Sequence, residues 1–352
     1  MAYRATLVSQ DPLEYLMEHD EDGPRLHIAD VVLRINNSIR EVAAHLIRIA
    51  TNSKWSHSAL VYVVNSPPRG LRNTFLIEAQ TQGINFSSWR NEVMPFKEFT
   101  VGIKRPKLDW YIENAHEKAK GNPYDQENRH GISYLQHVRE VAVDQIHGLY
   151  DHKVVGELAC LYAERVARRH LGKLPLVAQA AHALADVFKK WGAKNDPRAH
   201  VMHFMCSGLV QYSFFTALRY RILHDLHIPE YRENALHNLR NMQRVLYRSD
   251  QYQVMSMYIR RLLAEELDLA DPVPSEVLDL LKTATPADFN NSPNLEWRYM
   301  ILNGNVWQID EAPTGYVAQS KDEAGVLAML RSEHHPHGGK PKRACSWLTA
   351  HN

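Results

Sequence analysis

The stretch HFMCSGLVQYSFFTALRY, residues 203–220, places a cysteine where a strongly apolar segment begins. We expect a helix over 206–221, with Cys206 in its first turn. The unsatisfied amides and the dipole of a helix N-terminus lower the pKa of a thiol, and thiolate is the nucleophilic form of cysteine. The small residues Ser207 and Gly208 would let a substrate approach the sulfur. The alternative is an inert core cysteine, since free cysteine is among the most buried residue types.

A second segment, TNSKWSHSALVYVV at 51–64, carries a histidine at the start of a buried-looking strand. His57 could act there as the base for Cys206, and the alternative is a surface histidine in a loop. Glu78 lies among apolar residues in FLIEAQ at 75–80, where a buried carboxylate needs a partner. If the two strands are neighbours, Glu78 orients the imidazole; otherwise it is a partly exposed edge residue. We expect the His57 strand to be central, the Glu78 strand beside it, and the group to open onto a cleft.

The motif CSGLVQY at 206–212 closely resembles the nucleophile motif of bacterial cell-wall endopeptidases of the NlpC type, which are papain-like. In those proteins the histidine strand follows the cysteine, whereas here SHSALVY at 56–62 precedes it. This order resembles the permuted papain-like amidases that include the YaeF/YiiX proteins, and more distantly the lecithin retinol acyltransferase relatives. GNPYD at 121–125 and TPADFNNSPN at 285–294 look like later landmarks of the same group. The chain departs from it at Gly208, where a glutamate is frequent.

The resemblance implies an α+β, circularly permuted papain-like fold, with a small, mostly antiparallel sheet packed on the cysteine-bearing helix. It implies a thiol hydrolase or acyltransferase that cleaves an amide or ester bond through a thioester, with Cys206, His57 and Glu78 as catalytic residues. Four further residues are expected to bind substrate: Ser207, Trp55, Tyr124 and His203. For Tyr124 a packed aromatic side chain is an equal alternative. The expected substrates are a peptide, a lipid or an acylated small molecule.

The chain divides into four predicted regions. They are the His/Glu half of the core at 22–130, a helical insertion at 131–200, the Cys helix with further helices and a final hairpin at 201–310, and a C-terminal helix and tail at 311–352. Apolar periodicity predicts further helices at 38–50, 154–170, 174–191, 231–247, 251–267 and 275–283. β-Branched or alternating runs predict strands at 26–35, 58–64, 74–80 and 99–105. Asn303-Gly304 predicts a hairpin between 297–301 and 306–310.

Two alternatives to catalysis remain open. A non-catalytic binding module on the same fold would not need the full set of cysteine, histidine and glutamate. A metal-held helical protein is suggested by the H-x-x-H-x-x-C string of His200, His203 and Cys206. We interpret 200–205 as the approach to the helix, and no paired C-x-x-C accompanies the string, so we expect neither a metal nor another cofactor.

Composition limits the partners. The 352 residues carry 41 basic and 40 acidic side chains, a formal net charge of +1, which gives no reason to expect nucleic-acid binding or anionic-membrane binding. The chain shows no signal-like apolar segment and no apolar run of the roughly 18 residues that a membrane span needs. The scattered Cys160, Cys206 and Cys345 do not resemble a disulfide framework, so we expect a cytoplasmic protein. The helical insertion could form an oligomer contact.

Overall fold

The structure is a computed structural model of the chain. It describes residues 2–17, 19–20, 23–36, 48, 53–63, 74–80, 83–90, 99–114, 131–146, 148–150, 203–245 and 252–331. The predicted helices at 154–170 and 174–191 lie outside these residues, as does nearly all of the one predicted at 38–50. Tyr124 and His200 lie outside them as well.

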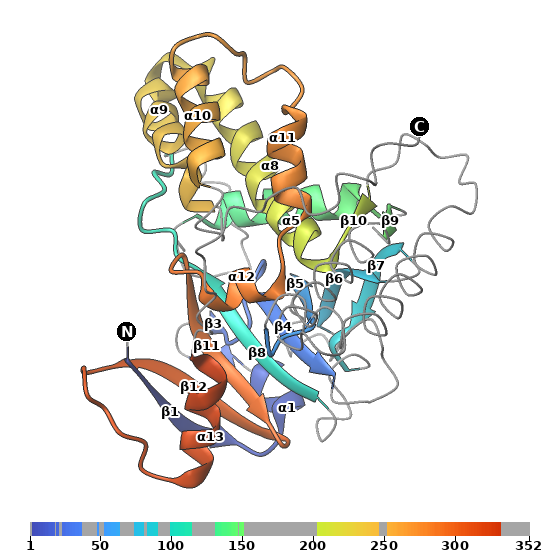
Figure 1. Cartoon of the computed structure of the whole chain (residues 1–352), viewed down its shortest axis with the longest axis vertical. Helices are drawn as coiled ribbons and strands as arrows, with labels where there is room; N and C mark the ends of the chain where they lie inside the picture. Colours follow the sequence, from blue (N-terminus) through green and yellow to red (C-terminus); the bar gives the residue numbers. More distant parts are fainter. Residues whose placement is uncertain are drawn as a thin grey trace, which may run out of the picture.

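One eight-stranded sheet forms the centre of the described part, in the order β1-β12-β11-β8-β4-β5-β6-β7 (Figure 1). Every neighbouring pair is antiparallel. The strands are β1 (Ala2–Ser9), β4 (Val31–Asn36), β5 (His57–Val63), β6 (Phe75–Gln80), β7 (Gly83–Ser88), β8 (Phe99–Pro106), β11 (Leu295–Leu302) and β12 (Asn305–Ala312). The predicted α+β class is confirmed, but the sheet is larger than the small sheet that we expected.

Four very short strands lie outside the main sheet. β2 (His19–Asp20) pairs with β3 (Gly23–Pro24) in an antiparallel ladder. β9 (Leu149–Tyr150) pairs in parallel with β10 (His203–Phe204), directly before the cysteine-bearing helix. This second pairing fixes the direction in which the chain enters that helix.

The hairpin between β11 and β12 confirms the turn prediction. Asn303 and Gly304 both have positive φ, 53° and 80°, and Leu302 pairs with Asn305 across the turn. Two consecutive left-handed residues define a type I′ turn, whose twist matches that of the flanking strands, and Asn-Gly adopts it most readily. The strand that then pairs with β12 is β1, at the other end of the chain. The four predicted regions begin at residue 22, so the prediction did not include β1.

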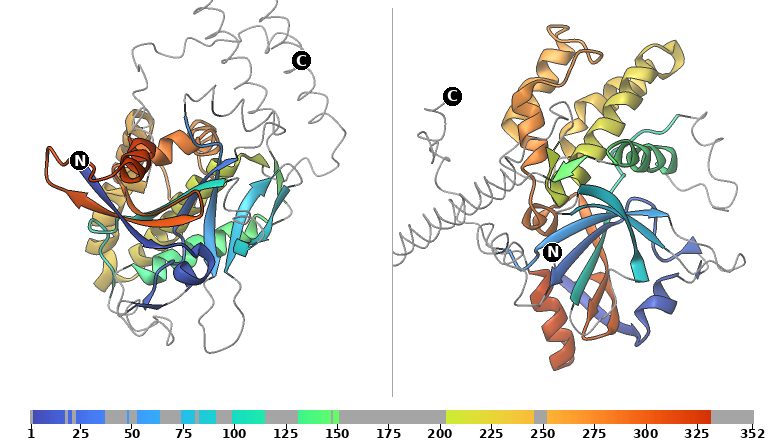
Figure 2. Two further views of the ribbon diagram at one scale, coloured as in Figure 1. Left: turned by 90° about the horizontal axis from the view of Figure 1, so that it is seen from below. Right: turned by 90° about the vertical axis from the view of Figure 1, so that its right-hand side faces the viewer.

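The helices between residues 206 and 282 lie together on one side of the sheet, and the helix at 321–330 packs against β1 (Figure 2). The described helices are α1 (Pro12–Met17), α5 (Ile132–Asp144), α8 (Cys206–Leu226), α9 (Arg232–Arg240), α10 (Tyr252–Leu263), α11 (Ser275–Lys282), α12 (Pro286–Asn291) and α13 (Lys321–Leu330). Two short 3₁₀ turns are η2 (Pro229–Tyr231) and η3 (Met242–Val245). The helices predicted at 206–221, 251–267 and 275–283 are confirmed, and the one at 231–247 divides into α9 and η3.

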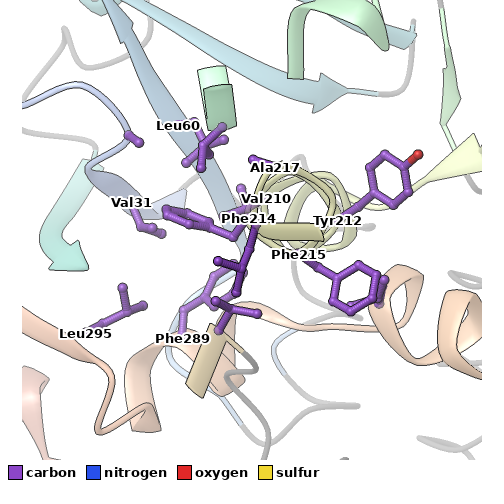
Figure 3. Packing of buried hydrophobic residues seen from close by; sticks show 14 of the residues in the cluster. Val31, Leu60, Val210, Tyr212, Phe214, Phe215, Ala217, Phe289 and Leu295 are labelled. Atoms are coloured by element: carbon purple, nitrogen blue, oxygen red, sulfur yellow. The ribbon is translucent and has the colours of Figure 1, made fainter. Parts of the chain in front are cut away.

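Helix α8 is the central helix of the core. Every residue from 206 to 219 is buried, which is the pattern of a helix that is covered on all sides rather than lying on a surface. Figure 3 shows Tyr212, Phe214 and Phe215 leaving α8 in different directions, and all three belong to the buried apolar cluster. Burying each large apolar side chain contributes roughly 1.5–3 kcal/mol to the stability of the fold, so this burial holds α8 firmly against the sheet.

Helix α5 packs along α8 and belongs to the same core. The Tyr134 hydroxyl donates to the Phe214 carbonyl at 2.9 Å, and Leu135 and Val138 are buried in the same apolar cluster. Helix α5 lies within the region 131–200 that we predicted to be a helical insertion, and its apolar face completes the packing around α8. The remainder of the predicted insertion, from 151 to 200, lies outside the described residues.

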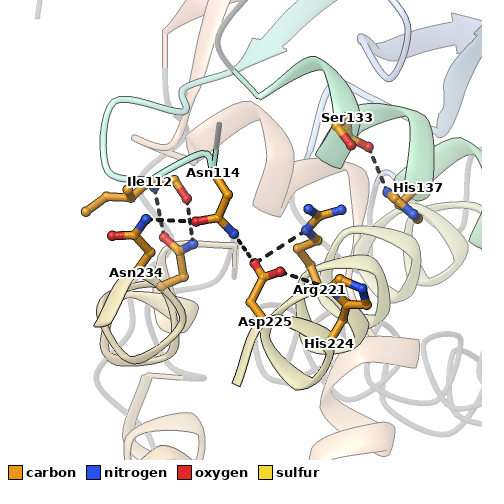
Figure 4. A network of polar contacts seen from close by, with 9 residues as sticks. Ile112, Asn114, Ser133, His137, Arg221, His224, Asp225 and Asn234 are labelled. Atoms are coloured by element: carbon orange, nitrogen blue, oxygen red, sulfur yellow. Dashed lines mark hydrogen bonds and ion pairs between the residues drawn. The ribbon is translucent and has the colours of Figure 1, made fainter. Parts of the chain in front are cut away.

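A polar cluster ties the chain after β8 to the far end of α8 and to α9 (Figure 4). Asn238 binds both backbone groups of Ile112, accepting from its N–H and donating to its carbonyl, each at 2.9 Å. Asn114 donates to the buried Asp225 at 2.7 Å and accepts from Asn234 at 2.8 Å. These hydrogen bonds satisfy polar groups of the segment after β8 that would otherwise bind water. They therefore attach α8 and α9 to the chain that leaves the sheet.

Gly208 lets α8 and α11 approach closely. A Cβ added at Gly208 would lie 2.4 Å from the carbonyl oxygen of Lys282, the last residue of α11. The expectation that this small residue opens a path for substrate is thus wrong, because the space is filled by backbone. We expect Gly208→Ala to lower the free energy of unfolding by about 1–3 kcal/mol in denaturant titrations, since two helices must separate.

Gly325→Ala is the matched control for this prediction. It also lies in a helix, α13, but its added Cβ would meet only the Leu302 side chain at 3.9 Å, an ordinary contact. Alanine in a helix interior is favoured over glycine, so this variant should be more stable by about 0.5–1 kcal/mol. Equal effects of the two substitutions would show that α8 and α11 do not meet at Gly208.

Candidate functional site: a cysteine, a histidine and a buried glutamate

Cys206 is the first residue of α8. Met205 precedes it in an extended conformation, with φ −75° and ψ 162°, so the backbone changes to helical geometry at the cysteine itself. The first amides of a helix have no partner within the helix, and they make its N-terminus partly positive. The prediction that Cys206 lies in the first turn of its helix is confirmed, and the sulfur therefore lies in a setting that favours its anionic form.

His57 begins β5, an interior strand between β4 and β6. Its neighbour β6 carries Glu78, so the predicted strand arrangement is confirmed. The imidazole Nε2 of His57 contacts Oε2 of Glu78 in a close hydrogen-bonded ion pair. These two residues are 21 positions apart, and only the pairing of β5 with β6 brings them together.

Glu78 is 1% exposed and both of its carboxylate oxygens are occupied. Oε2 faces His57, and Oε1 accepts a hydrogen bond from the hydroxyl of Ser87 on β7. Burial alone would raise the pKa of Glu78, but the charge and hydrogen bond of His57, the charge of Arg34 and the hydrogen bond from Ser87 outweigh it and lower the pKa to about 2. Glu78 is therefore a fixed anion, not the partly exposed edge residue of the alternative interpretation.

Glu78 occupies Nε2 of His57, which leaves the other ring nitrogen as the one that can face Cys206. Cys206 and His57 lie close enough for each to shift the pKa of the other. Burial would lower the pKa of His57, but the negative charges of Cys206 and Glu78, and hydrogen bonding of the imidazolium to them, raise it to about 9. The structure thus brings the three predicted residues together, although 149 positions separate the cysteine from the histidine.

The same contacts act on the thiol in the opposite direction. Burial would raise the pKa of Cys206, but the charge and hydrogen bond of His57, the backbone N–H of Ser58 and the Ser207 hydroxyl lower it to about 7. The two shifts have opposite directions, so the contacts around the pair favour the thiolate and imidazolium forms over the neutral thiol and imidazole.

Access to the sulfur differs from the expected open cleft. Cys206 is only 1% exposed, whereas the His57 side chain is 17% exposed. We expected the group to open onto a cleft, and within the group the sulfur is covered while the imidazole is partly exposed. Among the three residues, the imidazole provides the surface that solvent reaches.

Two of the predicted substrate contacts lie in the core instead. Trp55 has no exposed surface, and its indole N–H donates to Oδ1 of Asn290 at 3.1 Å. Its ring packs against Trp297, with centroids 5.8 Å apart, in the space that the missing side chain of Gly102 leaves free. Ser207 is likewise fully buried. The prediction that they bind substrate fails because both side chains are covered on all sides.

The other two predicted contacts stay predictions. Tyr124 lies outside the described residues. His203 is placed in β10 by its backbone, and its side chain is not among those described. Within the described ranges no group of three or more His, Cys, Asp or Glu side chains is arranged to hold a metal ion. The string that includes His200 is not tested by this observation, because His200 lies outside those ranges.

Sequence reasoning missed two serines of the site, Ser58 and Ser87. Ser58 follows His57 directly and has no exposed surface; Ser87 is 8% exposed. A signal for Ser58 was present, since it is a hydroxyl inside an otherwise apolar strand. No comparable signal marks Ser87, because its relation to Glu78 depends on the register between β6 and β7.

Comparison with known proteins adds no assignment. The chain matches no protein-family model, and no significant match was found among curated proteins. None of the described helices combines the length and the apolar character that crossing a lipid bilayer requires.

Proposed function

We propose that the chain is a thiol hydrolase or acyltransferase, in which Cys206 attacks an amide or ester carbonyl on a circularly permuted papain-like fold. One observation carries the proposal: a cysteine at the start of a buried helix interacts electrostatically with a histidine whose Nε2 is held by a buried glutamate. Nucleophile, base and orienting residue in this arrangement are the parts of covalent acyl-transfer catalysis. The order along the chain, with histidine and glutamate before cysteine, supports the permuted arrangement.

The proposed reaction proceeds in two halves. The Cys206 thiolate adds to the carbonyl carbon, and the amide of Cys206 at the helix start helps to hold the oxyanion. When the tetrahedral intermediate collapses, the bond from carbon to the leaving nitrogen or oxygen breaks, and the His57 imidazolium gives its proton to that atom. A thioester on Cys206 remains.

Neutral His57 then acts as the base in the second half. It takes a proton from water or from another acceptor, whose oxygen or nitrogen attacks the thioester and releases the acyl group. Glu78 stays anionic throughout and stabilises each imidazolium that forms. The proposed substrates are a peptide, a lipid or an acylated small molecule, all of which present the required carbonyl.

A second candidate is a non-catalytic binding module on the same fold. The burial of Cys206 favours it, since a sulfur that is 1% exposed does not meet a carbonyl without local movement. In that case the ion pair of His57 and Glu78 would serve only the packing between β5 and β6.

An acyl-electrophile screen separates the two candidates. Wild-type protein is treated with a panel of activated amides, esters and acyl-type activity probes, and adducts are located by peptide mass spectrometry. We expect stoichiometric acylation of Cys206 that fades with time as the thioester is released. Labelling confined to other residues, or none with the whole panel, would favour the binding module.

A further inference from the structure

The hydroxyl groups of Ser207 and Ser58 form a chain that ends on the Cys206 sulfur. Oγ of Ser207 lies 3.8 Å from Sγ of Cys206 and 2.9 Å from Oγ of Ser58. Ser58 and Ser207 have no exposed surface, and Cys206 has almost none. A pair of buried hydroxyls in an apolar core is costly unless each has a partner, and here each finds one in the other.

The direction of these hydrogen bonds depends on the state of the sulfur. A thiolate has no proton to donate, so it can only accept, and the Ser207 hydroxyl must then be the donor to Sγ. Having used its proton, Ser207 accepts from Ser58. The thiolate form therefore orders both hydroxyls into one run of donors that points at the sulfur, and hydrogen bonds to an ionised group are the stronger kind.

Ser58 reaches the sulfur in a second way, through its backbone. Its backbone amide helps to lower the pKa of Cys206, while its hydroxyl is hydrogen-bonded to that of Ser207. Because Ser58 follows His57 in β5 and Ser207 follows Cys206 in α8, the hydroxyl pair links the strand of the base directly to the helix of the nucleophile. The titratable groups that face the sulfur in the described part are His57 and, behind it, Glu78 with Arg34.

We propose that Ser58 and Ser207 form a two-hydroxyl relay that holds Cys206 as a thiolate at a set distance from His57, so that both are positioning residues and neither is a substrate contact. The inference rests on the proposed function, because a stabilised thiolate matters chiefly for a nucleophile. Ser207 would then act by positioning the sulfur of Cys206, and a completely buried side chain can do this without touching substrate.

The test measures the thiol pKa directly, without a substrate. Thiolate absorbance in the ultraviolet is followed against pH for each variant and for the same variant with Cys206→Ala, and the difference isolates this cysteine from Cys160 and Cys345. We expect Ser207→Ala to raise the pKa of Cys206 by roughly half a unit to one unit. Ser58→Ala should raise it by less, because its backbone N–H remains.

The double variant gives the sharpest result. If Ser58 acts through Ser207, adding Ser58→Ala to Ser207→Ala should produce no further shift, whereas two independent donors would give additive shifts. Ser213→Ala is the matched control, because Ser213 is also buried in α8 but donates to the Leu209 carbonyl at 2.8 Å, away from the site. It should leave the thiol pKa unchanged.

Unshifted thiol pKa values in folded Ser207→Ala and Ser58→Ala proteins would overturn the relay. If Ser207→Ala does not fold, two substitutions of Ser58 decide the matter. Ser58→Ala should raise the pKa of the Cys206 thiol, whereas Ser58→Thr keeps a hydroxyl and should leave that pKa near the wild-type value. Failure of the relay is distinct from failure of the proposed function. If only the relay fails, wild-type Cys206 is still acylated, but the serine variants show an unchanged thiol pKa. If the proposed function fails, the serine variants show a shifted thiol pKa, but wild-type Cys206 is not acylated.

Discussion

Cys206→Ala should abolish all turnover of any acyl substrate that wild-type protein processes, and all acylation at position 206. The reason is that a thioester can form only on a thiol, and Cys206 is the one cysteine among the residues that the structure describes. Residual activity at the level of the uncatalysed reaction is the expected result, measured as release of the acyl leaving group. Activity within tenfold of wild type in this variant would end the cysteine-hydrolase proposal.

Stability and a matched substitution serve as controls for this loss. Cys206 is buried, so alanine leaves a small void beside Ser207, and we expect the free energy of unfolding to fall by no more than about 2 kcal/mol. Cys206→Ser keeps the volume and the hydrogen bonds but replaces an acidic thiol by a hydroxyl that does not ionise at neutral pH. It should fold like wild type and remain inactive, which would separate chemistry from packing.

His57→Ala should reduce the rate of acylation at neutral pH by about 100- to 10,000-fold, because it removes both the base and the cation that stabilises the thiolate. Burial raises the pKa of the Cys206 thiol, and without His57 one of the groups that oppose this effect is lost. The thiol pKa should therefore rise, and the remaining activity should shift to higher pH. Glu78→Gln should reduce the rate by less, about ten- to a hundredfold, since it affects only orientation and charge. Equal losses in the two variants would show that Glu78 is needed for more than orientation.

The pH profile distinguishes these roles further. In wild-type protein the rate should rise as the thiol ionises around pH 7 and fall as the imidazolium loses its proton around pH 9, which gives a bell-shaped curve. Removing the charge of Glu78 lowers the pKa of His57, which moves the alkaline limb to lower pH. A less stable imidazolium also raises the thiol pKa, which moves the acid limb to higher pH. Glu78→Gln should therefore narrow the bell from both sides.

Glu323→Gln provides the control for the narrowed profile. Glu323 is also a buried carboxylate, but it binds the backbone of Ala5 and Gln319 and the hydroxyl of Tyr316, on the part of the fold around β1 and α13. Its loss should lower stability without changing either limb of the profile. A bell that narrows equally in both variants would indicate a general loosening of the fold.

Local patterns were sufficient for much of the architecture. The apolar run after Cys206 predicts α8 and its first residue, and Asn303-Gly304 predicts the hairpin, because helix starts and tight turns depend on neighbouring residues alone. The order of motifs suggested that His57 and Glu78 lie on adjacent strands and meet Cys206. That suggestion came from resemblance to a family, since nothing local relates residues so far apart. The permuted papain-like fold itself stays a prediction.

The sequence by itself determined which residue types could carry the chemistry and which segments would be helix or strand. Only the tertiary structure decided which of these side chains are covered. Trp55 and Ser207 stand beside predicted catalytic residues in the sequence, yet both are buried, because apolar packing is non-directional and no local pattern records what a distant segment will place over a side chain. The partners of Ser58, Ser87 and Gly208 were decided in the same way, by strand register and by the approach of α11 to α8.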